Sequence, residues 1–213
     1  KQDEGFWEGP DYLVSWAVGH LLELKEPEDY DPALEVWQLA TLPILPDPFQ
    51  RKARAKQGKQ LRLLKKLARR EEVVSLVNAC DAAREGELIF REIEEYVDCG
   101  KPVERLWLQS MTGDAISEAF DAMVPADTYE GLGNAAFCRA EADWLIGMNA
   151  TRGLTRRLRR RGERGVWSAG RVQTPTLAFL AQWRPFPSER AFWRWALAHL
   201  STYFPNLISQ SRF

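Results

Sequence analysis

The chain has 213 residues, of which 45% are hydrophobic and 28% charged, and its net charge is −1. This composition predicts a globular chain with room for one or two domains and a sizeable core. No run reaches the roughly 18 apolar residues of a membrane-spanning helix, and no signal peptide opens the chain, which argues against membrane and secreted proteins. Three scattered cysteines, Cys80, Cys99 and Cys138, form neither a zinc-binding pattern nor a disulfide framework, which indicates a reducing cytoplasm.

The near-neutral net charge conceals a strong asymmetry along the chain. Residues 1–138 contain 16 basic and 26 acidic residues, a net charge of −10, whereas residues 139–213 contain 13 arginines, no lysine and 4 acidic residues, a net charge of +9. A basic second part suits a polyanion such as nucleic acid, and arginine favours forked contacts to phosphate. A solvated basic helix face, or a coding bias toward arginine, would give the same counts.

The first two elements in chain order are a strand and an irregular excursion. Tyr12–Val18 alternates apolar and small residues, which predicts a strand, and Gly19 turns the chain out of it. His20 follows directly and could approach a site at the strand end, although a lone histidine there is more often a structural hydrogen-bonding residue. Residues 25–50 are rich in proline and acidic residues, which predicts an extended excursion.

A basic stretch follows at residues 51–70. Leu61, Leu64 and Leu67 recur at helical spacing, so we expect a helix with one apolar stripe packed on the sheet. The basic face of this helix either contacts a DNA backbone or is solvated, and the second interpretation is at least as good as the first.

The stretch that carries chemistry is residues 73–91. Val73–Ala79 is rich in β-branched residues and predicts a buried strand, and residues 87–98 have helical periodicity. Four charged residues lie between these elements or at the start of the second: Asp81, Arg84, Glu85 and Glu87. Carboxylates at the carboxyl end of such a strand lie where open α/β sheets bind ligands. They could hold Mg²⁺ or position protons in phosphoryl transfer, or they could simply stabilise the first helical turn.

Two further elements complete a repeated strand and helix pattern. Residues 103–109 predict a second parallel strand, and residues 114–123 predict a helix capped by Thr112. The order strand, helix, strand, helix predicts an α/β domain whose helices cover a parallel sheet. Pro125-Ala126-Asp127 is the expected domain boundary.

Residues 130–182 have a helical pattern and contain much of the positive charge. The first helix is expected at about residues 132–149, where Arg139 and Asp143 stand four positions apart. An arginine-rich stretch follows at residues 153–165.

The last motif is Ser168-Ala-Gly-Arg-Val-Gln-Thr-Pro-Thr, which opens another helix. Ala169 and Gly170 are small and permit close backbone approach, while Arg171 and Gln173 offer forked donors suited to phosphates and base edges. A buried helix start with one arginine would have a similar sequence.

Four stretches taken together resemble the type IA DNA topoisomerases, most closely the topoisomerase III branch. Asp81-Ala-Ala-Arg-Glu-Gly-Glu-Leu is similar to the Asp-x-Asp-x-Glu-Gly-Glu acidic motif of the Toprim domain in that family. The other stretches lie at residues 12–24, 139–149 and 168–176, and the resemblance covers residues 5–182.

The resemblance implies the domain organisation. Residues 1–125 would form a Toprim-type, Rossmann-like α/β domain with a parallel sheet that lacks its first strand. Residues 126–183 would form a mainly α-helical partial domain, the first part of a groove that leads single-stranded DNA to the active site. Residues 184–213 do not look like the family and are interpreted as a divergent tail.

The resemblance also assigns roles residue by residue. Asp81 and Glu85 would bind Mg²⁺ beside the cleaved phosphate, Arg84 would position the phosphate, and Glu87 would support the metal or the turn, so that Glu85, Arg84 and Glu87 form the catalytic set. Ala83 stands where the second aspartate is expected, which removes one metal ligand. Five residues match the groove that binds single-stranded DNA: Arg139, Asp143, Ser168, Arg171 and Gln173.

The implied reaction depends on Mg²⁺ and not on ATP. A tyrosine cuts one DNA strand by transesterification, another strand passes, and the phosphodiester is resealed. None of the five tyrosines lies in the family's context for that nucleophile, so we expect a fragment that cannot relax DNA by itself. The resemblance further implies single-stranded DNA as a partner, no nucleotide cofactor, no membrane, and a location in the bacterial cytoplasm in association with the nucleoid.

Two other classes of protein remain open. A non-catalytic remnant that binds single-stranded DNA would show salt-sensitive binding that depends neither on Mg²⁺ nor on Asp81. Another Toprim enzyme, primase-like or nuclease-like, is opposed by residues 168–176, because those relatives lack the groove domain. A nucleotide-binding Rossmann domain is disfavoured, because no Gly-x-Gly-x-x-Gly follows a strand.

Overall fold

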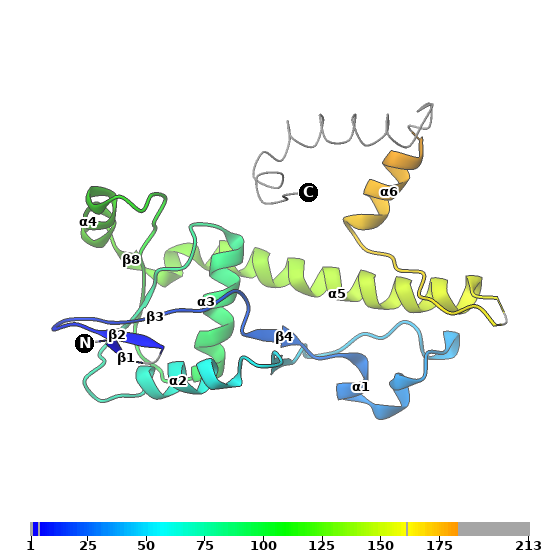
Figure 1. Ribbon diagram of the computed structural model, residues 1–213, viewed down its shortest axis with the longest axis horizontal. Coiled ribbons are helices and arrows are strands. Elements are labelled where there is room, and N and C mark those ends of the chain that lie inside the picture. Colours follow the sequence, from blue (N-terminus) through cyan, green and yellow to red (C-terminus); the bar gives the residue numbers. More distant parts are fainter. Residues whose placement is uncertain (1, 4, 161, 183–213) are drawn as a thin grey trace. The chain divides into compact units, whose positions relative to one another are not determined.

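The computed structural model describes residues 2–3, 5–160 and 162–182. Its contacts divide the chain into two units, residues 1–168 and residues 169–213, which are considered separately (Figure 1). The predicted boundaries after residues 125 and 183 stay predictions. The predicted divergent tail, residues 184–213, lies outside the described residues.

The described strands of the first unit are short and form three small sheets. An antiparallel meander contains β1 (Gln2–Asp3), β2 (Phe6–Glu8) and β3 (Leu13–Ser15). An antiparallel pair contains β4 (Leu22–Leu24) and β5 (Arg51–Ala53). A mixed sheet contains β6 (Leu76–Asn78), β7 (Val103–Arg105) and β8 (Val124–Pro125). The strands expected around residues 12–18, 73–79 and 103–109 are therefore present, each over three residues.

The mixed sheet contains the predicted parallel unit. β6 pairs with β7 in parallel, with Leu76 opposite Val103, and the helix α3 (Arg84–Val97) connects them. This arrangement confirms the α/β class. The expectation of a buried strand is only partly correct, because Leu76 and Val77 are half-buried and Asn78 alone is fully buried. A three-stranded sheet has too little surface to bury both faces of such a strand.

The basic stretch folds as one strand and one helix. The helix α2 (Gly58–Ala68) begins later than the basic residues, because Arg51–Ala53 pair with β4 as the strand β5. Leu61 is fully buried with Leu21 and Leu22, and Leu64 packs against this core. The predicted apolar stripe is confirmed.

The proline-rich excursion consists of short helical turns that lie along the helix α5 (Glu130–Leu158). Its elements are α1 (Pro27–Tyr30) and the 3₁₀ turns η1 (Pro32–Glu35) and η2 (Leu39–Thr41). The Asn149 side chain exchanges two hydrogen bonds with the backbone of Ile44, at 2.6 and 2.9 Å. Trp144 Nε1 donates to the carbonyl of Lys25 at 3.1 Å. These side chains replace a regular sheet or helix as the partners of the excursion's backbone.

α5 is longer than the helix predicted from the sequence, because no strong helix breaker interrupts the arginine-rich stretch before residue 158. The helix α4 (Gly113–Asp121) has Thr112 at its N-cap as expected, although the threonine hydroxyl makes no capping hydrogen bond. The turn η3 (Ala126–Tyr129) leads into α5. No helix in the described part of the chain is long and apolar enough to cross a membrane.

The second unit contains the described helix α6 (Gln173–Gln182). The motif before it closes on itself, since Thr174 Oγ1 accepts from the amide of Gly170 at 3.0 Å and the amide of Thr174 donates to the Gly170 carbonyl at 3.1 Å. These bonds form the first turn predicted for the Ser168–Thr176 motif.

Candidate functional site

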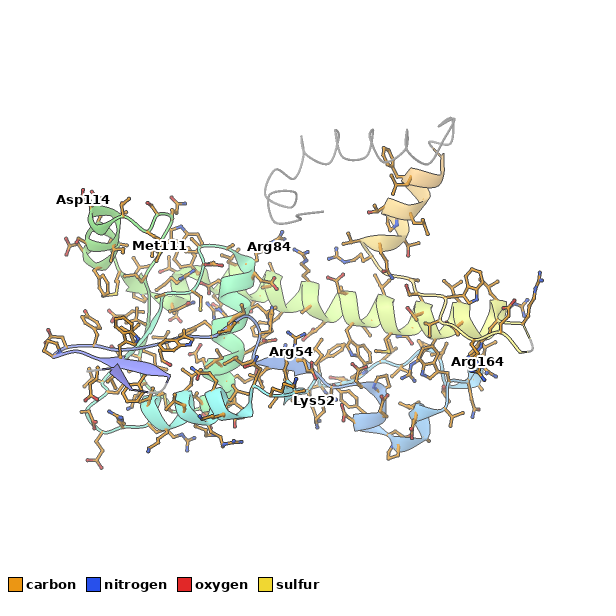
Figure 2. The ribbon with its side chains drawn as sticks, in the orientation of Figure 1. Lys52, Arg54, Arg84, Met111, Asp114 and Arg164 are labelled. Atoms are coloured by element: carbon orange, nitrogen blue, oxygen red, sulfur yellow. The ribbon has the colours of Figure 1, made fainter. Side chains whose placement is uncertain are left out.

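The candidate site is the turn between β6 and α3, which contains the acidic motif. The chain leaves β6 at Asn78, makes a tight turn in which the amide of Ala83 donates to the Asp81 carbonyl at 2.7 Å, and enters α3 at Arg84. Asp81, Arg84 and Glu85 are exposed. In Figure 2, Arg84 lies at the N-terminal end of α3, where the helix dipole favours negative charge in a ligand. Exposed polar side chains therefore follow a parallel strand, as the sequence predicted.

Glu87 occupies a different environment from the other motif acids, because its side chain is only 1% exposed. Its Oε1 lies 2.6 Å from Nε of Arg105 and accepts from Asn78 Nδ2 at 3.1 Å, while its Oε2 accepts from Arg91 Nε at 3.1 Å. Both carboxylate oxygens are engaged by the protein itself. These contacts favour support of the turn, one of the two roles that the sequence left open for Glu87.

Arg105 is the second half of this buried pair, and sequence reasoning missed it. Its guanidinium donates to four backbone carbonyls, those of Asn78, Cys80 and Asp81 at 2.8 Å and that of Leu106 at 2.9 Å. Three of these carbonyls belong to the end of β6 and the start of the motif turn. A charged residue inside a predicted strand was the available signal, because a buried arginine needs a carboxylate and carbonyl partners.

Two aromatic rings connect the buried Glu87–Arg105 pair to η3. The Arg105 guanidinium lies 4.8 Å from the ring centroid of Trp107, and that ring stacks on Tyr129 at 4.4 Å between centroids. Arg91 also donates to the carbonyl of Ala126, at 3.2 Å. The motif turn is therefore connected to the start of α5 by side chains of β7 and α3.

Gly86 explains why the motif needs a glycine between its two glutamates. A Cβ built on Gly86 would lie 2.1 Å from the carbonyl oxygen and 2.8 Å from the amide nitrogen of Asp81. No side chain fits this space, and the obstacle is backbone that cannot rotate away. The glycine therefore permits the close packing that places Asp81 against the first turn of α3.

His20 connects one exposed motif acid to the interior, a role that the sequence left undecided. Its Nε2 lies 2.6 Å from Oε1 of Glu85, and its Nδ1 lies 3.2 Å from Oε2 of Glu92, which is buried. The other oxygen of Glu92 accepts from Arg51 Nε at 3.1 Å. The Arg51 guanidinium packs 4.6 Å from the ring centroid of Phe137 in α5. His20 is thus a hydrogen-bonding residue that also positions a motif carboxylate.

These partners raise the pKa of His20 above its ordinary value of 6.5, first through the hydrogen bond with Glu92 and then through Glu85, against an opposing effect of burial. A histidine with a raised pKa in the folded state stabilises the fold fully below pH 6.5, and this contribution is lost as the pH rises through the raised value. We expect the free energy of unfolding to fall over that interval, and to fall less in His20→Gln. Urea unfolding at several pH values checks this, and equal pH profiles for the two proteins would contradict it.

The donors of the turn suit at most a sparse metal site. Among the residues that the structure describes, no group of three or more His, Cys, Asp and Glu side chains lies close enough to hold a metal ion. Ala83 contributes no ligand, and Glu85 already contacts His20. Mg²⁺ often uses only one or two protein carboxylates and completes its shell with water and phosphate, so Asp81 and Glu85 fit that ion but not a fully protein-coordinated one.

Cys80 adjoins the turn without taking part in this chemistry. Its thiol is free, and burial raises its pKa, which keeps it protonated. It packs as a small apolar residue.

The five predicted groove residues are divided between the two units. Arg139 and Asp143 lie on α5, where Arg139 Nε and Asp143 Oδ2 are 3.8 Å apart and both side chains are exposed enough to reach a ligand. Ser168 ends the first unit, and Arg171 and Gln173 are exposed residues of the second. Their assignment to a common groove stays a prediction.

Comparison with known proteins gives the family. The protein family described as DNA topoisomerase matches residues 127–184, a segment that includes α5 and α6. The chain is 44% identical over 182 residues to the DNA topoisomerase 3 of Bacillus subtilis (strain 168), a match that covers 85% of this chain and 24% of that protein. The corresponding proteins of Bacillus licheniformis and Bacillus cereus are 43% and 42% identical over 182 and 181 residues, again over 85% of this chain and 24% of each relative. These matches support a type IA, topoisomerase III-like fragment.

This chain spans about a quarter of the length of the relatives that it matches. The segment of this chain that matches the family, residues 127–184, includes all five residues predicted for the groove. The resemblance inferred from four stretches of sequence is thereby confirmed.

Proposed function

We propose that this chain contributes the Toprim-type part and the beginning of the DNA-groove part of a type IA DNA topoisomerase, which changes DNA topology by cutting, passing and resealing one strand. The observation that carries the proposal is that Asp81 and Glu85 are exposed on a turn whose backbone is bound by the buried Glu87–Arg105 pair. A turn fixed in this way presents charged groups at constant positions, which catalysis at a phosphate requires. The similarity to proteins named DNA topoisomerase 3 supports this assignment.

In this proposal the roles divide between exposed and buried residues. Asp81 and Glu85 would hold Mg²⁺, which when bound neutralises charge on the reacting phosphate. The proposed reaction uses no nucleotide cofactor. Arg84 is exposed and its side chain makes no hydrogen bond or ion pair with other described residues, so its guanidinium is available to a phosphate oxygen. Glu87 and Arg105 keep the turn in place, and His20 orients Glu85.

The DNA partner is proposed to be single-stranded and to contact Arg139, Asp143, Ser168, Arg171 and Gln173. Forked donors on a helix start suit phosphates and the edges of unpaired bases.

The nucleophilic tyrosine of the implied reaction is not assigned to any tyrosine of this chain. We therefore expect no relaxation of supercoiled plasmid by the chain alone, and relaxation in the presence of Mg²⁺ would contradict this expectation.

Binding of a fluorescent single-stranded oligonucleotide, with and without Mg²⁺, tests the proposal. We expect Arg171→Ala to weaken binding roughly 5- to 100-fold, since a hydrogen-bonded charge contributes about 1–3 kcal/mol. Arg54→Ala is the matched control, because Arg54 is an exposed arginine already paired with Glu23 at 3.2 Å (Figure 2). Equal weakening in both variants would indicate unspecific attraction and contradict a groove at Arg171.

The alternative, a non-catalytic remnant that binds single-stranded DNA, is separated by Asp81→Asn. If Asp81 and Glu85 hold the ion, Mg²⁺ increases the affinity of the parent chain for the oligonucleotide and does so much less in Asp81→Asn. Binding that is the same with and without Mg²⁺, and unchanged by Asp81→Asn, would favour the remnant.

A further inference from the structure

A cavity at the C-terminal end of α5 lies outside the acidic motif and the predicted groove residues. It has a volume of about 300 Å³ and lies between the last turns of α5, the excursion around η1, and the segment that follows α5. Arg156, Arg159, Trp37 and Val166 are among the residues that line it. This volume is at the lower limit of the cavities that bind small ligands.

The segment that follows α5 is fixed where it borders this cavity. The chain turns back along the last turns of the helix (Figure 1), and the amide of Trp167 donates to Oγ1 of the buried Thr155 at 2.9 Å. On the opposite side, the buried Arg152 lies 5.1 Å from the ring centroid of Trp37 and pairs with Glu28 at 3.2 Å. The walls of the cavity are therefore held by specific contacts.

The charge of the cavity is positive and largely uncompensated. The Arg156 side chain makes no hydrogen bond or ion pair within the described part of the chain, and the Arg159 side chain uses Nε only on the backbone carbonyl of Glu163, at 2.7 Å. The Glu163 carboxylate accepts from the backbone amide of Arg160 and pairs with no described arginine side chain. One acid, Glu35, also lines the cavity. Three more exposed arginines stand close in sequence to Arg156 and Arg159: Arg157, Arg160 and Arg164, the last labelled beyond the end of α5 in Figure 2.

Helix electrostatics explain part of this pattern but not all of it. Arginines in the last turn stabilise the negative end of a helix dipole without any ligand. That effect does not require an indole in the cavity wall, nor the neighbouring Trp167 and Val166, which are 51% and 59% exposed. Cations beside aromatic rings are the combination with which proteins bind single-stranded nucleic acid, since phosphates contact the cations and bases stack on the rings.

We propose that this cavity binds one nucleotide of single-stranded DNA, with its phosphate on Arg156 and Arg159 and its base against Trp37. The inference deepens the proposed function and rests on it, because it assigns the same DNA strand a second contact beyond the groove residues. The cavity would hold the strand at a point determined by the rigid end of α5.

The two halves of the cavity give different signatures in oligonucleotide binding. Trp37→Ala removes a stacking partner, so we expect affinity to fall roughly 5- to 100-fold with an unchanged dependence on salt concentration. The double variant Arg156→Ala/Arg159→Ala leaves phosphates without their cations, so the slope of log affinity against log salt should decrease by about 0.7 for each phosphate that is no longer neutralised. Trp7→Ala, at an exposed tryptophan of β2, and Arg54→Ala are the matched controls and should leave both quantities unchanged.

A site-specific readout keeps the test valid if Trp37→Ala impairs folding. Oligonucleotides that contain 5-bromodeoxyuridine should crosslink on irradiation to the peptide that contains Trp37 or Trp167, and the crosslink should disappear in the arginine double variant. Circular dichroism checks that this variant, changed only at the end of α5, is folded. Crosslinks that map elsewhere, or variants indistinguishable from their controls, would overturn the inference.

The outcomes separate this inference from the proposed function. If Arg171→Ala weakens binding and the cavity variants do not, the cavity proposal fails and the groove stands. If the cavity variants weaken binding while Arg171→Ala and Asp81→Asn have no effect, the cavity binds DNA and the topoisomerase assignment of the motif fails. If thymidine monophosphate binds in a Trp37-dependent manner but oligonucleotide affinity is independent of Trp37, the cavity takes a free nucleotide, and the single-strand proposal is overturned.

Discussion

Replacing Gly86 by alanine will destabilise the chain by about 1–3 kcal/mol or more, which is the cost of inserting a methyl group where no space exists. The added Cβ would overlap the Asp81 carbonyl at 2.1 Å, so either the motif turn or the first turn of α3 must move. Urea unfolding followed by circular dichroism measures the loss. The same variant should also lose any effect of Mg²⁺ on oligonucleotide binding, because Asp81 is displaced.

Gly131→Ala is the matched control for this change. Gly131 lies in the first turn of α5, and a Cβ built there meets nothing within 4 Å. Alanine is favoured over glycine in helices by up to about 1 kcal/mol, so this variant should be unchanged or more stable. Similar stabilities for the two variants would show that the turn adapts to a side chain and that the motif glycine has another purpose.

Replacing Arg105 by methionine will cost about 3–5 kcal/mol of the free energy of unfolding, the cost typical of removing one partner from a buried ion pair. Methionine is apolar and flexible, and it leaves Glu87 without its main counter-charge and four carbonyls without their donor. Arg54→Ala, at the exposed pair with Glu23, should cost at most about 1 kcal/mol. A loss below that of the control would contradict the role given to Arg105.

The double variant Arg105→Met/Glu87→Leu separates the two contributions of the pair. Removing both charges eliminates the unpaired carboxylate, so part of the stability should return. The carbonyls of Asn78, Cys80 and Asp81 remain without their donor, so the recovery should be incomplete. Full recovery would show that the backbone contacts of Arg105 contribute nothing measurable.

The apolar spacing of the sequence determined the local elements near the site. The β-branched run before Asp81, the helical period after Arg84 and the leucine stripe of residues 61–67 each correspond to an observed strand or helix. The reason is that burial of one face selects the period of a strand or helix from local residues alone. The lengths were less well predicted, because pairing partners and not local residues decide where a strand of three residues ends.

The sequence also identified the family and the exposed motif acids, since these depend on residue identity and order. It assigned Glu85 to the metal but left open whether Glu87, two positions further along the same motif, supports the metal or the turn. One carboxylate is buried and the other exposed because residues two positions apart in a helix face different sides, and only the packing of α3 decides which side meets Arg105. The fold brings together three pairs that are distant in the sequence, and contacts at such separations leave no periodic signal in the chain. The pairs are His20 with Glu85, Glu87 with Arg105, and Ile44 with Asn149. What the sequence determined by itself is which chemical groups are available at the turn, and the tertiary structure alone decided which of them are used internally and which remain available to a ligand.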